Sequence, residues 1–255
     1  MSFMDAHCHF DFPVFDGRRE TLLSAARQVG VSRLVVPGVR EADWPRVVAV
    51  ADQFPEVAYC LGIHPWFVDE HGPGALDRLR QAVSVGSGCL GLGECGLDRL
   101  RGSLDQQLPW FEGQLDIARD LKLPVVVHSV RTHDEVAAVL RRKPLTAPML
   151  VHGFAGSYQQ AKVFVDQGCM LGIGGVITYP RARKTRNAVA ALPLDALVLE
   201  TDAPDMPPSG VAKGANEPAR LADVFRALLA LRPEPADVLE EALWNNATRL
   251  YCRAQ

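Results

Sequence analysis

The stretch Met4-Asp-Ala-His-Cys-His-Phe10 is a short strand-like run that carries two histidines, His7 and His9. Other apolar runs end in ligand-type side chains in the same way: Glu94 after Cys89-Leu-Gly-Leu-Gly, His128 after Pro124-Val-Val-Val, His152 after Met149-Leu-Val and Asp202 after Leu197-Val-Leu-Glu-Thr. Burying such polar groups without partners is costly. If the strands share one end of one sheet, all six side chains converge, and this set of imidazoles and carboxylates suits a pair of divalent metal ions.

Apolar strand-like runs alternate with helix-like segments along the whole chain. The predicted strands are Met4–Phe10, Arg33–Val36, Val57–Ile63, Cys89–Glu94, Pro124–His128, Met149–His152, Cys169–Ile173 and Leu197–Asp202. The predicted helical segments are Thr21–Val29, Glu41–Phe54, Leu104–Leu121, Asp134–Arg141, Tyr158–Gln167, Asn187–Leu192, Pro218–Leu231 and Ala236–Leu250. Eight strands alternating with helices over about 250 residues are typical of a (β/α)8 TIM barrel. We therefore expect an α/β fold in which residues 1–255 form a single barrel domain.

A doubly wound open sheet is the competing arrangement. Such a sheet gathers ligands only at a switch crevice, whereas the ligand-type residues here belong to the first, fourth, fifth, sixth and eighth strands. A TIM barrel collects residues from all of its strands at their C-terminal ends, where its active sites lie. The pattern therefore favours the barrel, with the metal site at the C-terminal ends of the strands.

The composition is that of an ordinary globular protein, with 48% hydrophobic residues and a formal net charge of −3. This charge excludes a basic footprint over the whole surface, so any contact with nucleic acid must be local. The six cysteines show no CxxC motif, which predicts small buried side chains in a reducing compartment. No apolar run reaches the length of a membrane span. We expect a soluble, cytoplasmic and monomeric protein.

The histidines and the first carboxylate have distinct predicted roles as metal ligands. His7 and His9 are two residues apart on a strand, so they point to the same side and can bind one ion together. Glu94 lies among three glycines, whose small size allows close approach, and its carboxylate can bridge two cations about 3.5–4 Å apart. His128 and His152 complete the ligands of the second ion.

Asp202 ends the last predicted strand, and the following Ala203-Pro204 forces the chain into a loop. We assign it two roles, as metal ligand and as general base toward the attacking water, so that Glu94 and Asp202 are the catalytic residues. Glu200 and Asp5 face the same way but lie deeper in the barrel. Both are therefore expected to pack or hydrogen-bond there, outside the ligand set.

Residues that follow other strands are candidates for holding a substrate. His64 in Gly62-Ile-His-Pro65 can bind a substrate anion, and Arg131, just past His128, is the second predicted substrate contact. A basic loop after the seventh strand can contact phosphates electrostatically, and it contains Arg181, Arg183, Lys184 and Arg186. Aromatic residues of the same loops can stack on bases, although packing explains at least half of them; they are Trp66, Phe67, Phe154 and Tyr179.

Six motifs in order resemble the signatures of TatD-type metal-dependent deoxyribonucleases, in the amidohydrolase-like superfamily, and the bacterial YjjV-type branch in particular. They are Asp5-Ala-His-Cys-His9, Gly62-Ile-His-Pro65, Gly93-Glu-Cys-Gly-Leu-Asp98, His128-Ser129, His152-Gly-Phe154 and Glu200-Thr-Asp-Ala-Pro204. The resemblance implies 3'-5' exonuclease-like hydrolysis of phosphodiester bonds, with single-stranded DNA or its 3' ends as substrate. It also implies two divalent metal ions (Mg²⁺, Mn²⁺ or Zn²⁺) on His7, His9, Glu94, His128, His152 and Asp202.

Two positions depart from the family pattern. Cys95 stands where Ile is common, and Val130 replaces an Arg that commonly follows His-Ser, with Arg131 one residue later. Two other functions stay open. One is a metal-dependent hydrolase of a small-molecule ester, lactone or amide; the other is a metal-binding protein that recruits a partner without turnover. The sequence also leaves open the metal, the polarity of cleavage and the choice between DNA and RNA.

Overall fold

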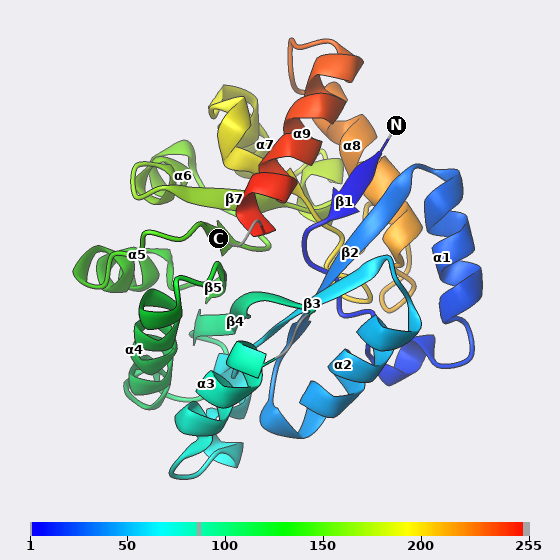
Figure 1. The fold of residues 1–255 in the computed structure, drawn as a ribbon. Coiled ribbons are helices and arrows are strands. Elements are labelled where there is room, and N and C mark those ends of the chain that lie inside the picture. Colours follow the sequence, from blue (N-terminus) through cyan, green and yellow to red (C-terminus); the bar gives the residue numbers. More distant parts are fainter. Residues whose placement is uncertain (1, 86–87, 252–255) are drawn as a thin grey trace.

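The structure, a computed structural model, describes residues 2–85 and 88–251. Eight parallel strands follow one another in sequence order around a barrel, with helices on the outside (Figure 1). The strands are β1 (Phe3–Asp5), β2 (Val31–Gly38), β3 (Val57–Leu61), β4 (Cys89–Asp98), β5 (Val125–Val130), β6 (Met149–Val151), β7 (Cys169–Ile173) and β8 (Leu197–Leu199). Almost all strand residues are buried, as expected where both faces are covered. The predicted TIM-barrel fold is confirmed.

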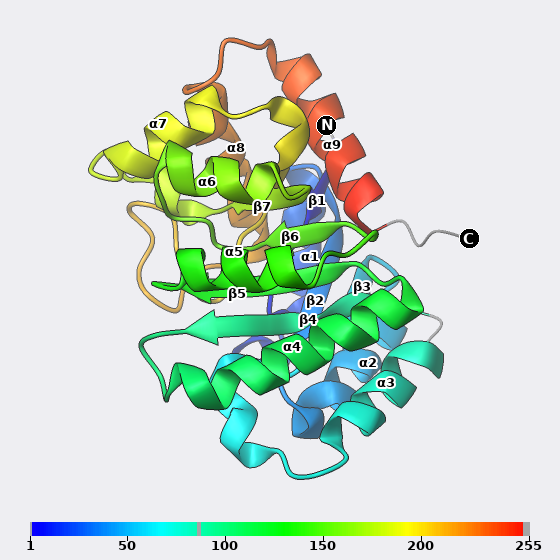
Figure 2. The same ribbon diagram turned by 90° about the vertical axis from the view of Figure 1, so that its left-hand side faces the viewer.

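The helices surround the barrel and are best followed from the side (Figure 2). They are α1 (Arg19–Gln28), α2 (Trp44–Gln53), α3 (Ala75–Val85), α4 (Leu104–Leu121), α5 (His133–Arg142), α6 (Tyr158–Val165), α7 (Arg183–Ala191), α8 (Leu221–Leu229) and α9 (Ala236–Tyr251). Helix α4 has the predicted bounds: Ser103 caps its start by accepting a hydrogen bond from the amide of Asp105, and Lys122 ends it in a left-handed conformation.

Most other helices differ from their predicted bounds by one to three residues at an end, and two differ more. Helix α3 was not predicted, although Ala75, Leu79 and Val83 are buried at a spacing of four residues. Helix α7 begins at Arg183 rather than Asn187, and Thr185 in its first turn is buried together with Ala188 and Val189. Of the basic residues expected in a loop after the seventh strand, Arg183, Lys184 and Arg186 therefore lie on a helix, and only Arg181 precedes it.

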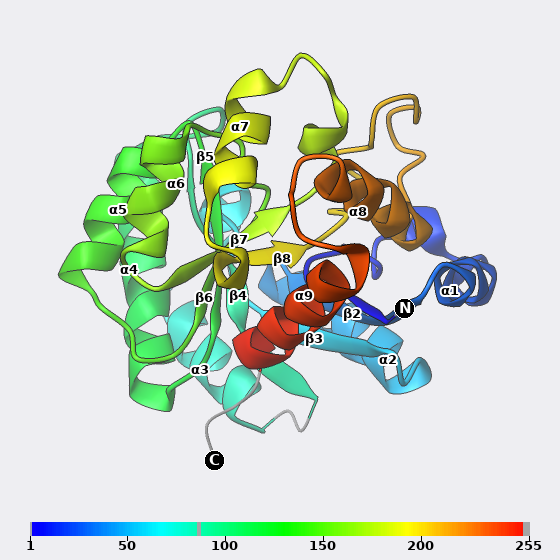
Figure 3. The same ribbon diagram turned by 90° about the horizontal axis from the view of Figure 1, so that it is seen from above.

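The barrel interior is closed at one end by the last helix. Interior side chains from the strands form a separate apolar cluster that also includes Ala247, Leu250 and Tyr251 of α9. Leu90, near the start of β4, packs against the same cluster. Helix α9 therefore covers the N-terminal ends of the strands, and the view from above shows it beside β1 and β8 (Figure 3). The C-terminal ends are left for the polar side chains.

Strands β1 and β8 are the two edges of the sheet, and backbone hydrogen bonds just beyond them close the barrel. The amide of Ala6 donates to Leu199, the amide of Asp202 donates to His7, and the amide of His9 donates to Ala203, each at 2.9 Å. The segments that carry three of the predicted ligands therefore form the seam of the barrel.

The structure also tests what the composition predicted about membrane spans and cysteines. Among residues 2–85 and 88–251, no helix is both long and apolar enough to span a membrane. Five of the six cysteines are buried, as predicted, and these are Cys8, Cys60, Cys89, Cys95 and Cys169. The sixth, Cys252, lies outside the described residues.

Candidate metal centre

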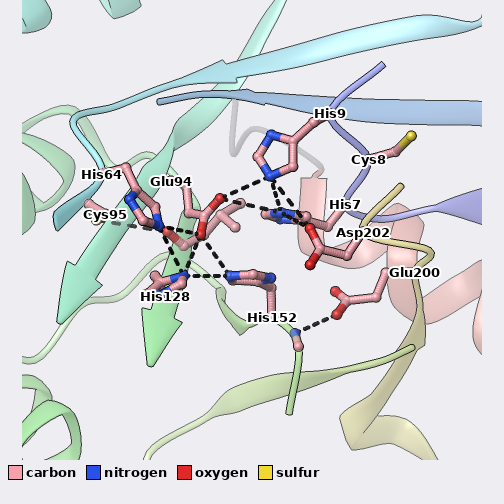
Figure 4. A network of polar contacts seen from close by, with 12 residues as sticks. His7, Cys8, His9, His64, Glu94, Cys95, His128, His152, Glu200 and Asp202 are labelled. Atoms are coloured by element: carbon pink, nitrogen blue, oxygen red, sulfur yellow. Dashed lines mark hydrogen bonds and ion pairs between the residues drawn. The ribbon is translucent and has the colours of Figure 1, made fainter. Parts of the chain in front are cut away.

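All six predicted ligands lie together at the C-terminal ends of the strands (Figure 4). The first donor group consists of His7 Nε2, His9 Nε2, Glu94 Oε2 and Asp202 Oδ1. His7 Nε2 lies 3.3 Å from His9 Nε2, 3.4 Å from Glu94 Oε2 and 3.2 Å from Asp202 Oδ1. His9 Nε2 lies 3.4 Å from each of the two carboxylate oxygens.

These separations fit a common cation. Four ligands at about 2.1 Å from a tetrahedral ion lie about 3.4 Å from one another, which is close to the five distances observed. Glu94 Oε2 is buried and accepts no hydrogen bond from the described residues. Buried carboxylate oxygens normally accept hydrogen bonds, so this oxygen is available to coordinate a cation. The first donor group therefore has the spacing and the unpaired oxygen of a metal site.

A second donor group uses the other oxygen of the same carboxylate. Glu94 Oε1 lies 2.6 Å from His128 Nδ1 and 2.7 Å from His152 Nε2, and these two nitrogens are 3.1 Å apart. Because Glu94 contributes Oε2 to the first group and Oε1 to the second, its carboxylate joins the two. This is the arrangement that the bridging role predicted for Glu94 requires, and the role itself stays a prediction.

The ligands do not all end strands as predicted. β1 ends at Asp5, so His7 and His9 lie beyond the strand, and their rings are brought together by the seam. β4 continues four residues past Glu94. β4 passes β5 so closely that a side chain at Gly93 or Gly96 would clash with the β5 backbone, and both residues have positive φ. The glycines thus let the Glu94 segment lie against the β5 backbone.

Burial and mutual charge set the protonation of the cluster. Burial lowers the pKa of His7, but Glu94 and Asp202 outweigh it and raise that pKa well above its usual range. Likewise, hydrogen bonds to Asp98 and Glu94 overcome burial and raise the pKa of His128 to about 9. Burial raises the pKa of both ligand carboxylates, yet the surrounding histidines hold both values well below the usual range. A cation that binds here replaces protons, so its affinity increases with pH.

Asp98, which has no assigned role in the sequence analysis, orients His128. Its Oδ2 lies 3.0 Å from His128 Nε2, and a carboxylate can only accept, so Nε2 bears a proton. His128 Nδ1 faces Glu94 Oε1, and it would be the ligand atom when a cation replaces its proton. Gln107 of α4 fixes the Asp98 backbone by accepting from its amide and donating to its carbonyl. The only sequence signal for Asp98 was its place in the motif Gly93–Asp98.

The ring of His64 lies beside the second donor group but has a different role. Its Nδ1 accepts a hydrogen bond from the amide of Trp66 at 3.1 Å, so in the neutral ring Nε2 bears the proton. Burial lowers the pKa of His64 to about 4, and the ring is therefore neutral at physiological pH. His64 Nε2 is 3.3 Å from Glu94 Oε1, and His64, Glu94 and His128 lie close enough to hold an ion together. With its proton on Nε2, however, the neutral ring acts as a hydrogen-bond donor.

A cavity of about 680 Å³ opens over the donor groups. Its apolar and aromatic lining consists of Phe12, Val39, Trp66, Phe67, Leu100, Val130, Met206 and Pro207, and its polar lining includes Asp98, Asp205 and Lys213 beside the ligands. The exposed Trp66 ring also donates from Nε1 to Asp98, and the guanidinium of Arg101 lies over it at 4.6 Å. Phe12, Asp205 and Lys213 were not predicted.

Several predicted substrate contacts are not in this cavity. Arg131 is exposed after β5 and does not line it. Phe154 is buried against His133, and the hydroxyl of Tyr179 donates to the carbonyl of Pro207. Of the four aromatic residues, Trp66 and Phe67 are in position to contact a ligand, and the other two pack.

Glu200 and Asp5 lie deeper, as predicted. Glu200 accepts a hydrogen bond from the amide of Gly153, next to His152. Asp5 accepts from the hydroxyl of Thr201 at 2.5 Å and from its amide at 2.9 Å. Both carboxyl groups therefore support the backbone around the ligands.

Comparison with known proteins agrees with the geometry. A family model described as TatD related DNase matches residues 4–252. The chain belongs to the TatD family. It is 44% identical to the Escherichia coli K12 protein named "Uncharacterized metal-dependent hydrolase YjjV", over 98% of this chain and 97% of the relative. The crystal structure of this TatD homologue superposes with a TM-score of 0.94 over the same shares of the two chains.

Two further relatives within the TatD family differ in their names. A Haemophilus influenzae protein, 42% identical over 98% of this chain and 100% of its own, is named "Uncharacterized metal-dependent hydrolase". A Pantoea protein is named "3'-5' ssDNA/RNA exonuclease TatD" and is 30% identical, over 91% of this chain and 93% of its own length. Of these three relatives, the one with the exonuclease name is the least similar to this chain.

Proposed function

We propose that this chain, a metal-dependent hydrolase of the TatD family, removes nucleotides from the 3' end of single-stranded DNA by hydrolysing phosphodiester bonds. The observation that carries this proposal is Glu94, whose two oxygens join two groups of donor atoms. Such paired sites suit the displacement of an oxygen at phosphorus, in which both the attacking and the leaving oxygen need stabilising. The Pantoea relative named a 3'-5' exonuclease supports the choice of nucleic acid.

The residues divide into those that hold cations and those that act on the substrate. His7, His9, Glu94 and Asp202 would hold one divalent ion, and Glu94 with His128 and His152 a second. When bound, divalent ions lower the pKa of water and neutralise charge on the phosphoryl oxygens.

Asp202 and His64 have the protonation states that the reaction requires. Asp202 lines the cavity and stays ionised at neutral pH, so it can orient the attacking water and accept its proton. His64 stays neutral with its proton on Nε2, directed toward the second donor group, and it can donate to a non-bridging phosphoryl oxygen. Acid–base partners within hydrogen-bond reach of the reacting atoms contribute about 10²–10⁴-fold to a rate.

The test is release of nucleotides from single-stranded DNA labelled at the 5' or the 3' end. Chelator-treated protein is titrated with Mg²⁺, Mn²⁺ or Zn²⁺, and Asp202→Asn is the inactive control. Metal-dependent shortening from the 3' end that is lost in the control supports the proposal. Absence of cleavage by protein that demonstrably binds metal contradicts it.

A second candidate function is hydrolysis of a small ester, lactone or amide. It is favoured by the cavity, since a volume of about 680 Å³ with a largely apolar lining is typical of small-molecule sites. The same metal-loaded protein is therefore assayed with cyclic amides and lactones. Turnover of these compounds without any DNA cleavage would replace the nuclease proposal.

A further inference from the structure

One positively charged residue that lines the cavity, Lys213, has no role in the proposed reaction. Apart from the histidines, the ionisable residues lining it are Glu94, Asp98, Asp202, Asp205 and Lys213. Lys213 is the one Lys or Arg among these lining residues, since Arg131 lies elsewhere. Apart from the histidines of the donor groups, Lys213 is therefore the lining cation that an anionic substrate meets in this cavity.

Lys213 is presented by a strap, residues 205–216, which connects the end of β8 to the segment before α8. Asn216 fixes the base of the strap, because its side-chain amide donates to the carbonyls of Thr201 and Asp205 at 2.8 and 2.6 Å. Further along, the amide of Ser209 donates to the hydroxyl of Thr178 at 2.7 Å. The strap is therefore held to the barrel on both sides of its exposed tip.

The tip is a turn that carries Lys213 over the cavity. The amide of Ala215 donates to the carbonyl of Ala212 at 3.0 Å, and Gly214 between them adopts φ +78°. Lys213 lies inside this turn and is exposed. The local backbone thus fixes the position of the Lys213 Cα while its side chain stays free to reach a ligand.

The charge of Lys213 is not neutralised by an ion pair. Lys143 pairs with Asp116 and Lys162 with Asp166, both at 2.7 Å, but Lys213 makes no ion pair with any residue of the described ranges. A neighbouring carboxylate, Asp205, interacts with it electrostatically without forming a contact. Lys213 is therefore available to an anion, and binding that anion would not break an existing pair.

We propose that Lys213 binds the phosphate of the substrate at the cavity mouth, a contact that the displaced Arg131 does not make. This inference deepens the proposed function and rests on it for the identity of the anion. It also predicts the orientation of the ligand. The charged group lies between the metal centre and the strap, and the uncharged body lies against the aromatic lining residues Phe12, Trp66 and Phe67.

The experiment measures binding rather than turnover. Manganese-loaded protein is titrated calorimetrically with thymidine 5'-monophosphate and with thymidine, using wild type, Lys213→Met and Lys213→Arg. Lys162→Met is the matched control, because it removes an exposed lysine on α6. Metal content is measured for every variant, so that a change in affinity is not caused by loss of the ions.

We expect Lys213→Met to weaken binding of the monophosphate about fivefold, the upper end for an exposed ion pair. Lys213→Arg should bind the monophosphate as tightly as wild type, and so should Lys162→Met. The affinity for thymidine should be the same in all variants. The inference is overturned if wild type and Lys213→Met bind the monophosphate with equal affinity, or if wild type does not bind it. It is also overturned if Lys213→Met loses as much affinity for thymidine as for the monophosphate. If Lys213 proves necessary for phosphate binding and DNA is not cleaved, the proposed function fails while the anion site stands.

Discussion

The backbone amide of Asp202 donates a hydrogen bond of 2.9 Å to the carbonyl oxygen of His7. These two residues follow the first and the last strand, and both belong to the first donor group. Because β1 and β8 are the edges of the sheet, this hydrogen bond joins the barrel at the point where the ligands converge. A cation held by both residues would therefore connect the two edges a second time.

We predict that divalent metal stabilises the fold by closing this seam. At a free metal concentration about 100 times its dissociation constant, the gain in the free energy of unfolding is about 2.7 kcal/mol. The measurement is the thermal midpoint of chelator-treated protein with increasing Mn²⁺. His128→Asn leaves the first donor group complete, so its thermal midpoint should still rise with metal. A midpoint that does not change with metal in either protein would show that the seam is not a metal site.

Glu94→Gln should affect both donor groups at once. Its neutral amide offers one weak oxygen in place of two carboxylate oxygens, so we expect the metal content to fall from two ions toward zero. In His152→Asn the first group survives, and one ion should remain. Elemental analysis after gel filtration distinguishes the two variants. Hydrolysis should fall by at least about 10²–10³-fold in Glu94→Gln, and retention of two ions would refute the bridging role.

Glu200 makes the stability of the chelator-treated protein depend on pH. Burial raises the pKa of its carboxyl group from 4.5 to about 8, so the folded state favours the protonated form. An acid with a raised pKa in the fold lowers the free energy of unfolding progressively as pH rises from 4.5 to 8. Glu200→Gln mimics the protonated group, so its free energy of unfolding lacks this decrease with pH. Its thermal midpoint should therefore exceed that of wild type by more at pH 8 than at pH 5, and a constant difference would contradict the prediction.

The hydroxyl of Tyr251 connects the last helix to the ligand-bearing segment. It donates a hydrogen bond of 2.6 Å to the carbonyl of Ala6, the residue before His7, and both groups are buried. Tyr251→Phe leaves this carbonyl without its partner, at an expected cost of about 1–3 kcal/mol. Urea unfolding gives the value, and the partly exposed Tyr158 supplies the control variant Tyr158→Phe. Equal stability of the two variants would mean that water replaces the lost hydrogen bond.

The barrel and the convergence of six ligand-type side chains could be predicted from the sequence because both depend on a periodic pattern; that these side chains bind metal stays a prediction. Buried parallel strands are continuous apolar runs, and polar residues at their ends stand out against them. The extent of β4 beyond Glu94 was missed, since Cys95-Gly-Leu-Asp98 carries no apolar alternation and is held by pairing with β5. Tertiary hydrogen bonds, rather than local propensity, decide where that strand ends.

Residues on long connections were harder to predict. Lys213 reaches the cavity because Asn216 and Ser209 fix the strap, and neither contact has a signature in the chain. Arg131 was chosen for its closeness in sequence to His128, but the backbone turns there with a positive φ and places Arg131 outside the cavity lining. The orientation of the His128 ring likewise depends on Asp98, which lies 30 residues away in the sequence and is brought near only by the fold.

The distribution of the donors along the chain also sets the order in which the centre can form during translation. Glu94, His128 and His152 come from β4, β5 and β6, so the second donor group is complete once the ribosome has released these middle strands. The first group waits for Asp202, which follows the last strand. If the two donor groups bind ions as proposed, a nascent chain would hold one ion while its barrel is still open. It would hold the second only after the segment that follows β8 has paired with the segment that follows β1.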